Sequence, residues 1–139
     1  MRRIAALFVM AILAAACGGQ SVFSLSVGTC FDDQESTEIS SVPEVECSEP
    51  HDNEVFAVID YAESDVYPGT DEMSDIGTRL CIEQFDEYVG LAYLESDLDV
   101  FAITPSQSSW DEDNDREVIC ALFNLDLSKL TGSMQGAAR

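Results

Sequence analysis

The side chains of this 139-residue chain with the widest chemical repertoire are five cysteines and a single histidine, His51. A histidine near cysteines is the beginning of a zinc site, and a histidine beside a nucleophile is a general base. However, no two cysteines are separated by two residues, and no second histidine is available to complete a ligand set. We therefore predict no metal site, no cofactor and no catalytic residue. His51 is interpreted as a structural side chain that orders the turn after Cys47.

Acidic side chains alternate at Asp111, Asp113 and Asp115, as they do at the start of a calcium-binding loop. An EF-hand loop that began at Asp111 would need glycine at its sixth position and glutamate at its twelfth. The chain has Arg116 and Leu122 there. We interpret the run as a solvated acidic turn, with weak binding of a divalent cation as the alternative.

Trp110 directly precedes this acidic run. A single large aromatic residue near the start of a strand usually packs inside the protein, so we predict that Trp110 lies in the core. The alternative is an exposed tryptophan that anchors a partner. The candidate interaction residues are His51, Asp52, Trp110, Asp111, Asp113 and Asp115.

An export signal precedes the first cysteine, Cys17. Two arginines at positions 2 and 3 are followed by an apolar or small run over residues 4–16, which is shorter than the ~20 residues of a membrane-spanning helix. The sequence L-A-A-A-C over residues 13–17 resembles the bacterial lipobox, whose cysteine is acylated and becomes the new N-terminus. We expect a signal peptide over residues 1–16 and a lipidated Cys17 followed by a flexible stalk over residues 17–24. An ordinary cysteine at an ordinary cleavage site is the alternative.

The four remaining cysteines are an even set, which in an exported chain implies disulfide bonds. Three pairings are possible. We favour Cys30–Cys47 and Cys81–Cys120, because each pair joins elements that are expected to be neighbours. On the loop-entropy model the two bonds would stabilise the fold by roughly 3 and 4 kcal/mol.

The chain is strongly acidic, with 27 acidic and 6 basic residues and a formal charge of −21. Removal of residues 1–16 would leave 4 basic residues and a charge of −23. Such a charge argues against a nucleic-acid partner, since binding a phosphate backbone requires clustered lysine and arginine. We expect a domain tethered to the membrane by its lipid, with a basic envelope protein or divalent cations as its partners.

Hydrophobic spacing predicts one helix among several strands. Alternating or continuous apolar residues indicate strands at 25–31, 39–47, 55–61, 98–103 and 117–125, the first of them broken by a turn at Gly28. Pro43 makes the second of these an edge strand or a bulge. Apolar residues at three-to-four spacing predict a helix with Thr70 as its N-cap and Gly90 as its stop. The predicted fold class is α+β, a mainly antiparallel sheet with one packed helix, over residues 25–130. Residues 131–139 are predicted to be a flexible tail.

Four short motifs carry a resemblance to a known family. They are G-x-C-F at 28–31, C-x-x-P-H-x-x-E-V at 47–55, C-x3-F-x2-Y-V-G at 81–90 and D-R-x-V-x-C at 115–120. Together they resemble the bacterial septum-formation domain family, whose members are secreted or membrane-anchored. The resemblance implies a link to cell division. Asn114 stands where many members carry glycine, and a turn is expected there.

Two functions are compatible with these features. The first is a non-enzymatic, lipid-anchored interaction domain on the extracytoplasmic side of the cell membrane, acting in envelope or septum assembly. The alternative is a small hydrolase that acts on envelope material with paired carboxylates. The hydrolase requires a concave pocket with two convergent carboxylates, at least one of which has a raised pKa.

Overall fold

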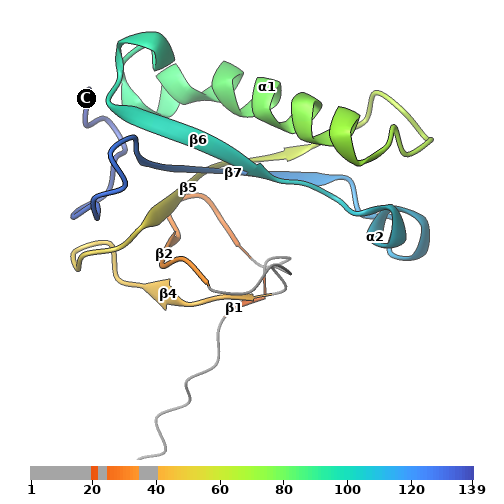
Figure 1. Cartoon of the computed structure of the whole chain (residues 1–139), viewed down its shortest axis with the longest axis horizontal. Helices are drawn as coiled ribbons and strands as arrows, with labels where there is room; N and C mark the ends of the chain where they lie inside the picture. Colours follow the sequence, from red (N-terminus) through yellow and green to blue (C-terminus); the bar gives the residue numbers. More distant parts are fainter. Residues whose placement is uncertain (1–19, 22–24, 35–40) are drawn as a thin grey trace, which may run out of the picture.

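A five-stranded antiparallel sheet with one long helix, α1 (Thr70–Val89), across one face forms the body of the chain (Figure 1). This computed structural model describes residues 20–21, 25–34 and 41–139. The strand order is β4-β2-β5-β7-β6. The strands are β2 (Cys30–Phe31), β4 (Glu44–Val45), β5 (Asn53–Asp60), β6 (Leu98–Ile103) and β7 (Glu117–Asn124). The predicted α+β fold class is confirmed.

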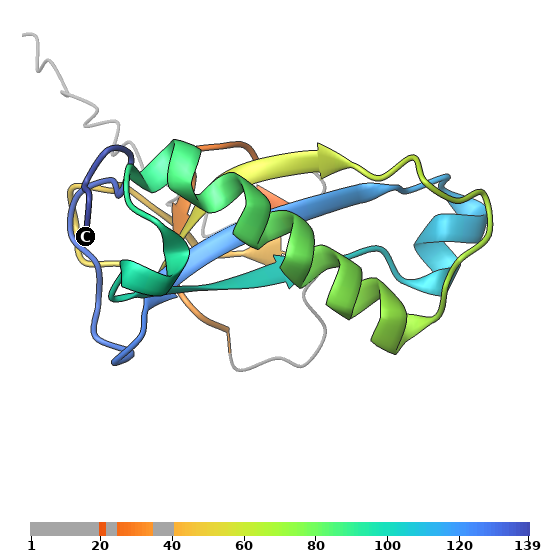
Figure 2. The same ribbon diagram turned by 90° about the horizontal axis from the view of Figure 1, so that it is seen from above.

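Both predicted disulfides are present. Cys30 in β2 is bonded to Cys47 in the loop before β5, with Cα atoms 5.3 Å apart. Cys81 in α1 is bonded to Cys120 in β7, also with Cα atoms 5.3 Å apart. The second bond ties the helix to the central part of the sheet, and Figure 2 shows α1 lying along that sheet.

The N-terminal part of the domain is built from shorter strands than the sequence predicts. Gly28 has a φ of 89°, so the chain turns there as predicted, and of the segment at 25–31 only β2 is a strand. Pro43 stands between β3 (Ser41–Val42) and β4, where the chain passes from one sheet to the next. β3 pairs with β1 (Gln20–Ser21).

Most of the segment predicted to be a signal peptide and stalk lies outside the described residues, and so does Cys17. The two residues of β1 are the exception, since they fall within the predicted stalk and are paired with β3. No described helix has the length and apolar character needed to span a membrane.

A β-bulge in β5 decides which of its side chains face α1. The register between β5 and β7 shifts between Val55 and Ala57, which inserts Phe56 as an extra residue. Phe56 and Ala57 therefore both pack in the cluster beneath α1, whereas Val55 and Val58 belong to the cluster on the opposite face of the sheet.

α1 begins one residue earlier than predicted, because an N-cap at Thr70 would make position 71 the first helical residue. Thr70 is the first helical residue, and Gly69 occupies the N-cap position with a φ of 103° and no side-chain cap. The prediction of Thr70 as N-cap is therefore wrong. Gly90 ends the helix in the left-handed conformation with a φ of 83°, as predicted.

α1 approaches β6 closely at Gly77. A Cβ at this position would lie 2.6 Å from Cγ2 of Thr104 and 2.8 Å from Cβ of Ala102. Glycine is therefore required by packing, although it weakens the helix by itself.

The acidic run predicted as a turn begins inside a short helix, α2 (Gln107–Glu112). Ser106 caps this helix by accepting a hydrogen bond from the Ser109 amide, and the Ser109 side chain accepts one from the Ser106 amide. Hydrophobic spacing does not predict this helix, because it ends after six residues and buries only Trp110. Asn114 follows with a φ of 53°, a conformation that glycine and asparagine tolerate.

The C-terminal residues pack on the domain, in contrast to the flexible tail expected at 131–139. The Gly136 amide donates to the Tyr88 carbonyl and the Ala138 amide to the Val89 carbonyl, both at 2.8 Å. These carbonyls belong to the last turn of α1, where intrahelical donors are lacking. Met134 is buried. The tail is held because it supplies donors that the end of the helix needs.

Candidate functional site

His51 lies directly before β5 and is completely buried. Its backbone forms a bridge with Leu130, with hydrogen bonds of 3.1 and 2.8 Å in the two directions. Nδ1 lies 2.8 Å from the Glu49 carbonyl, and because a carbonyl only accepts, Nδ1 is the donor. Nε2 has no hydrogen-bond partner in the structure. The ring therefore orders the turn after Cys47, and its second nitrogen is buried.

Glu54, near the start of β5, is a fully buried carboxylate. It accepts hydrogen bonds from Tyr88 Oη at 2.7 Å, Ser133 Oγ at 2.5 Å and the Met134 amide at 2.6 Å. The donors come from α1 and from the C-terminal residues, so one side chain joins three parts of the chain. Burial, followed by the hydrogen bond to Glu54, raises the pKa of Tyr88 to about 12.

Cys30, His51 and Glu54 each bring a potential metal-ligating atom to within 4.8 Å of the others. The sulfur of Cys30 is bonded to Cys47, and the Glu54 carboxylate already accepts three hydrogen bonds. His51 Nε2 is therefore the single potential ligand atom of this group that is not already bonded or hydrogen-bonded. A zinc site needs three or four protein ligands. We therefore treat the three residues as a closed polar core.

Asp52 is half-buried and used inside the domain. Its Oδ1 lies 2.9 Å from Lys129 Nζ, and Lys129 also lies 2.7 Å from Asp32. Partial burial alone would raise the pKa of Asp52, but the hydrogen bonds from Lys129 and from the Asp33 amide outweigh it and lower the pKa. The predicted interaction residue Asp52 thus ties β2 and β5 to the segment after β7.

Trp110 lies at the other end of β5. Its ring packs 6.2 Å from the ring of Tyr61, which follows β5, and the Arg116 guanidinium lies 3.6 Å above it. Only 2% of Trp110 is exposed, so the predicted core position is correct. Asp115 accepts hydrogen bonds from Ser109 Oγ at 2.9 Å and from the Glu117 amide at 3.0 Å.

The structure therefore separates the six predicted interaction residues. His51 and Asp52 lie at the start of β5, whereas the other four lie near its end. His51 and Trp110 are buried, so a partner cannot reach them in this conformation. Of the six, only Asp111 and Asp113 are exposed.

Two acidic residues face each other across β5 and β7. Asp60 and Glu117 are register partners. Burial, and then the charges of Asp115 and Asp60, raise the pKa of Glu117. A hydrolase would need such a pair inside a concave pocket, but neither Asp60 nor Glu117 lines any of the four described cavities.

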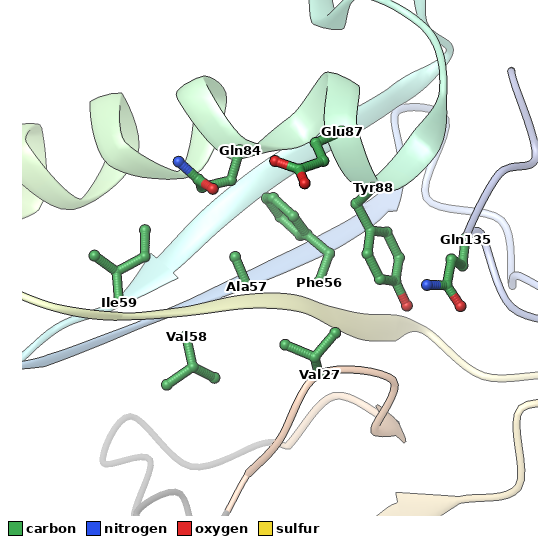
Figure 3. Close-up of a pocket in the computed structure, with 9 residues that line it drawn as sticks. All are labelled: Val27, Phe56, Ala57, Val58, Ile59, Gln84, Glu87, Tyr88 and Gln135. Atoms are coloured by element: carbon green, nitrogen blue, oxygen red, sulfur yellow. The ribbon is translucent and has the colours of Figure 1, made fainter.

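The largest described cavity is a groove of about 370 Å³ along β5 (Figure 3). Residues 56–59 of β5 form its base, Gln84, Glu87 and Tyr88 of α1 form one wall, and Val27 forms the other. Gln135 closes one end. Sequence reasoning missed this groove. The sequence does contain a signal for the groove, which is that two neighbouring strands differ in length. The glycine at position 28 interrupts the first predicted strand, while the apolar run at 55–61 continues.

A second cavity, of about 260 Å³, lies beside the C-terminal arginine. Arg139 Nε lies 3.0 Å from Asp97 Oδ1, and Nη2 donates to Asn124 Oδ1 at 2.7 Å. The hydrogen bond from Arg139 lowers the pKa of Asp97, and hydrogen bonds from Ser128 lower the pKa of Asp126. The two carboxylates of this cavity are therefore held in their charged forms.

The fold and this site define a small α+β domain that is stapled by two disulfides, with a closed polar core and an acidic surface. A model of the septum formation family matches residues 14–120, which is more than half of the chain. The chain therefore belongs to the septum formation family, and this confirms the resemblance found in its motifs. No curated protein and no solved structure shows significant similarity to it.

Proposed function

We propose that this protein is a lipid-anchored interaction domain outside the cytoplasm, without enzymatic activity, which binds a basic segment of an envelope or septal protein. Membership of the septum formation family supports the cellular setting. The lipobox-like sequence before Cys17 supports the anchor.

One observation carries the binding role: every basic side chain in the described residues is already engaged. Arg79 pairs with Glu83, Lys129 with Asp32 and Asp52, and Arg139 with Asp97. Arg116 stacks over Trp110 and donates to two carbonyls. Among the described residues, no further basic side chain is left to balance the remaining carboxylates. A basic partner would supply the missing charge and would be steered towards this surface.

Three of the carboxylates that line the cavities support binding over hydrolysis. A general acid needs a raised pKa, so that it still carries its proton near neutral pH. Asp52, Asp97 and Asp126 each line a described cavity, and the pKa of each is lowered. Glu117, whose pKa is raised, lines none of them.

Crosslinking of the full-length protein in intact membranes tests this proposal. We expect one envelope protein with a basic extracytoplasmic segment to be captured at low ionic strength and lost at high ionic strength, because the Debye length falls from about 30 Å at 0.01 M to about 3 Å at 1 M. Capture that does not respond to salt would contradict the electrostatic role. Saturable binding of calcium alone, with no captured protein, would favour the cation alternative.

A further inference from the structure

We propose that the open edge of β5 at residues 56–60 accepts an added β-strand from the partner, an extended segment in which basic and apolar residues alternate. This inference rests on the proposed function and names its binding site. The mode is strand addition, in which main-chain hydrogen bonds supply affinity and the side-chain walls supply selectivity.

β2 covers only the first part of β5. It pairs with Asn53 and Glu54, and two further hydrogen bonds of 2.8 Å join Val55 to Gly28 and Thr29. The chain then turns away at Gly28. No strand among the described residues pairs with this side of residues 56–60.

The direction of the backbone groups along this edge follows from one hydrogen bond. The Tyr61 amide donates to the Arg116 carbonyl at 2.9 Å, so Tyr61 faces β7. Successive residues of a strand direct their amides and carbonyls to opposite sides. Val58 and Asp60 therefore present their amides and carbonyls to the open edge. These are the groups that a strand antiparallel or parallel to β5 would use.

The two walls of the groove fit an extended chain with different faces. On the α1 side, the bulge turns Phe56 and Ala57 towards the helix, and Figure 3 shows Gln84 and Glu87 above them. On the other side lies Val27, of which 52% is exposed. An added strand would thus set alternate side chains against a polar, acidic wall and an apolar wall.

Charge selects the kind of strand. Glu87, which lines the groove, is exposed, and so is Asp60, which follows the lining residue Ile59 in β5. None of the lining residues is basic. All basic side chains of the described residues are engaged elsewhere, as shown above. Lysine or arginine at alternate positions would complement Glu87, and valine or a similar residue would cover Val27. A second copy of this chain is disfavoured as the occupant, since each copy carries a formal charge of −21.

Binding of synthetic peptides to the full-length protein in nanodiscs tests the site. The probe is an amidated ten-residue peptide in which lysine alternates with valine. The two control peptides are one with glutamate in place of lysine, and the lysine–valine peptide with every backbone amide N-methylated. We expect both controls to bind at least tenfold more weakly than the probe. Equal binding of the probe and the N-methylated peptide would overturn strand addition.

Two protein variants separate the edge from the general acidity of the surface. Val58→Pro removes an amide that points to the open edge, so it leaves the hydrogen bonds to β7 in place, and proline is tolerated at strand edges. This variant should weaken probe binding at least tenfold. Glu87→Lys should weaken it severalfold, whereas Asp75→Lys makes the same charge change on an exposed part of α1 outside the groove and should change it less than twofold. Equal effects of the two lysine variants would overturn the site.

Hydrogen exchange provides a readout that does not depend on folding of the proline variant. In the free protein the Val58 and Asp60 amides should exchange rapidly and the Tyr61 amide slowly, and the probe should protect Val58 and Asp60. Protection of both amides in the free protein would overturn the proposal. If this protection in the free protein grew with protein concentration, the occupant of the edge would be a second copy of the chain. If the protection vanished in a variant without residues 18–24, the occupant would be that segment of the same chain.

Crosslinking of the variants distinguishes this inference from the proposed function. Salt-sensitive capture that persists unchanged in Val58→Pro and Glu87→Lys would leave the interaction role intact and remove the β5 edge as its site. Loss of capture in the wild-type protein would instead contradict the proposed function itself.

Discussion

The phenol of Tyr88 donates a 2.7 Å hydrogen bond to Oε1 of Glu54 and so joins the last turn of α1 to the start of β5. Ser133 and Met134 bring two further donors to the same carboxylate from the C-terminal residues. A buried carboxylate is tolerated only when its hydrogen bonds are made. This one side chain therefore requires the helix, the sheet and the C-terminal residues to be assembled together.

Tyr88→Phe should destabilise the protein by ~1.5–3 kcal/mol, the range for a hydrogen bond to a charged group. Urea unfolding measures the difference. The matched control is Tyr67→Phe, whose hydroxyl makes only a 3.5 Å contact with Thr70 and whose loss should cost within about 0.5 kcal/mol. Equal effects of the two variants would contradict the role assigned to Glu54. Ultraviolet titration should in addition find two phenols, Tyr88 and Tyr93, that ionise only near pH 12, and one of them should be lost in Tyr88→Phe.

Gly77→Ala should destabilise the protein by ~1–3 kcal/mol, because the added Cβ meets Thr104 and Ala102 at distances below 3.0 Å. At an open position on a helix the same change is stabilising by up to about 1 kcal/mol, so the sign of the effect tests the contact. Thr104→Ser in the same chain removes the methyl group at 2.6 Å and should restore part of the stability. A thermal melt that rises in Gly77→Ala would refute the close approach.

Loss of the Cys81–Cys120 bond should cost more than loss of Cys30–Cys47. The bonds close loops with sequence separations of 39 and 17 residues, which correspond to roughly 4 and 3 kcal/mol on the loop-entropy model. Paired cysteine-to-alanine variants, unfolded in urea, give the two values. Mass analysis of the native protein without reductant should find both bonds, and four free thiols would contradict the pairing.

Glu117→Gln should stabilise the protein at neutral pH by ~0.2–1 kcal/mol, the range for charges that face each other across strands. The raised pKa of Glu117 means that the folded state holds its proton more tightly than the unfolded state. Its charge therefore destabilises the fold at neutral pH, and the penalty disappears as the pH falls below the ordinary pKa of 4.5. Unfolding from pH 3 to 7 measures the trend. Glu112→Gln, an exposed change, is the control.

Cys17→Ala should move the protein from the membrane fraction to the soluble extracytoplasmic fraction, because a diacylglyceryl group supplies the two chains that stable anchoring needs. Labelling with radioactive palmitate should be lost at the same time. Ser21→Ala, a nearby change that leaves the cysteine in place, should keep both. Unchanged membrane retention and labelling of Cys17→Ala would exclude the anchor.

The parts of this fold that sequence patterns predicted correctly are those with local signals. The three-to-four spacing before Gly90 predicted α1, and the position of Cys81 on its apolar face predicted the bond to Cys120. The six-residue helix α2 was missed, because so short a segment has almost no periodicity. The C-terminal residues were taken for a flexible tail, since their small and polar side chains do not reveal that their amides meet Glu54 and the end of α1.

Sequence alone determined the family and the α+β class of this protein, because each depends on residue types at fixed spacings, and it favoured one of three disulfide pairings, which the structure confirmed. Only the tertiary structure decided that Glu54, 34 residues from Tyr88 and 80 from Met134, is the centre of the polar core. It also decided that β5 extends past the point where the chain turns away at Gly28. Periodicity shows which face of an element is buried, but the partner of a polar group or a strand edge depends on how distant elements pack.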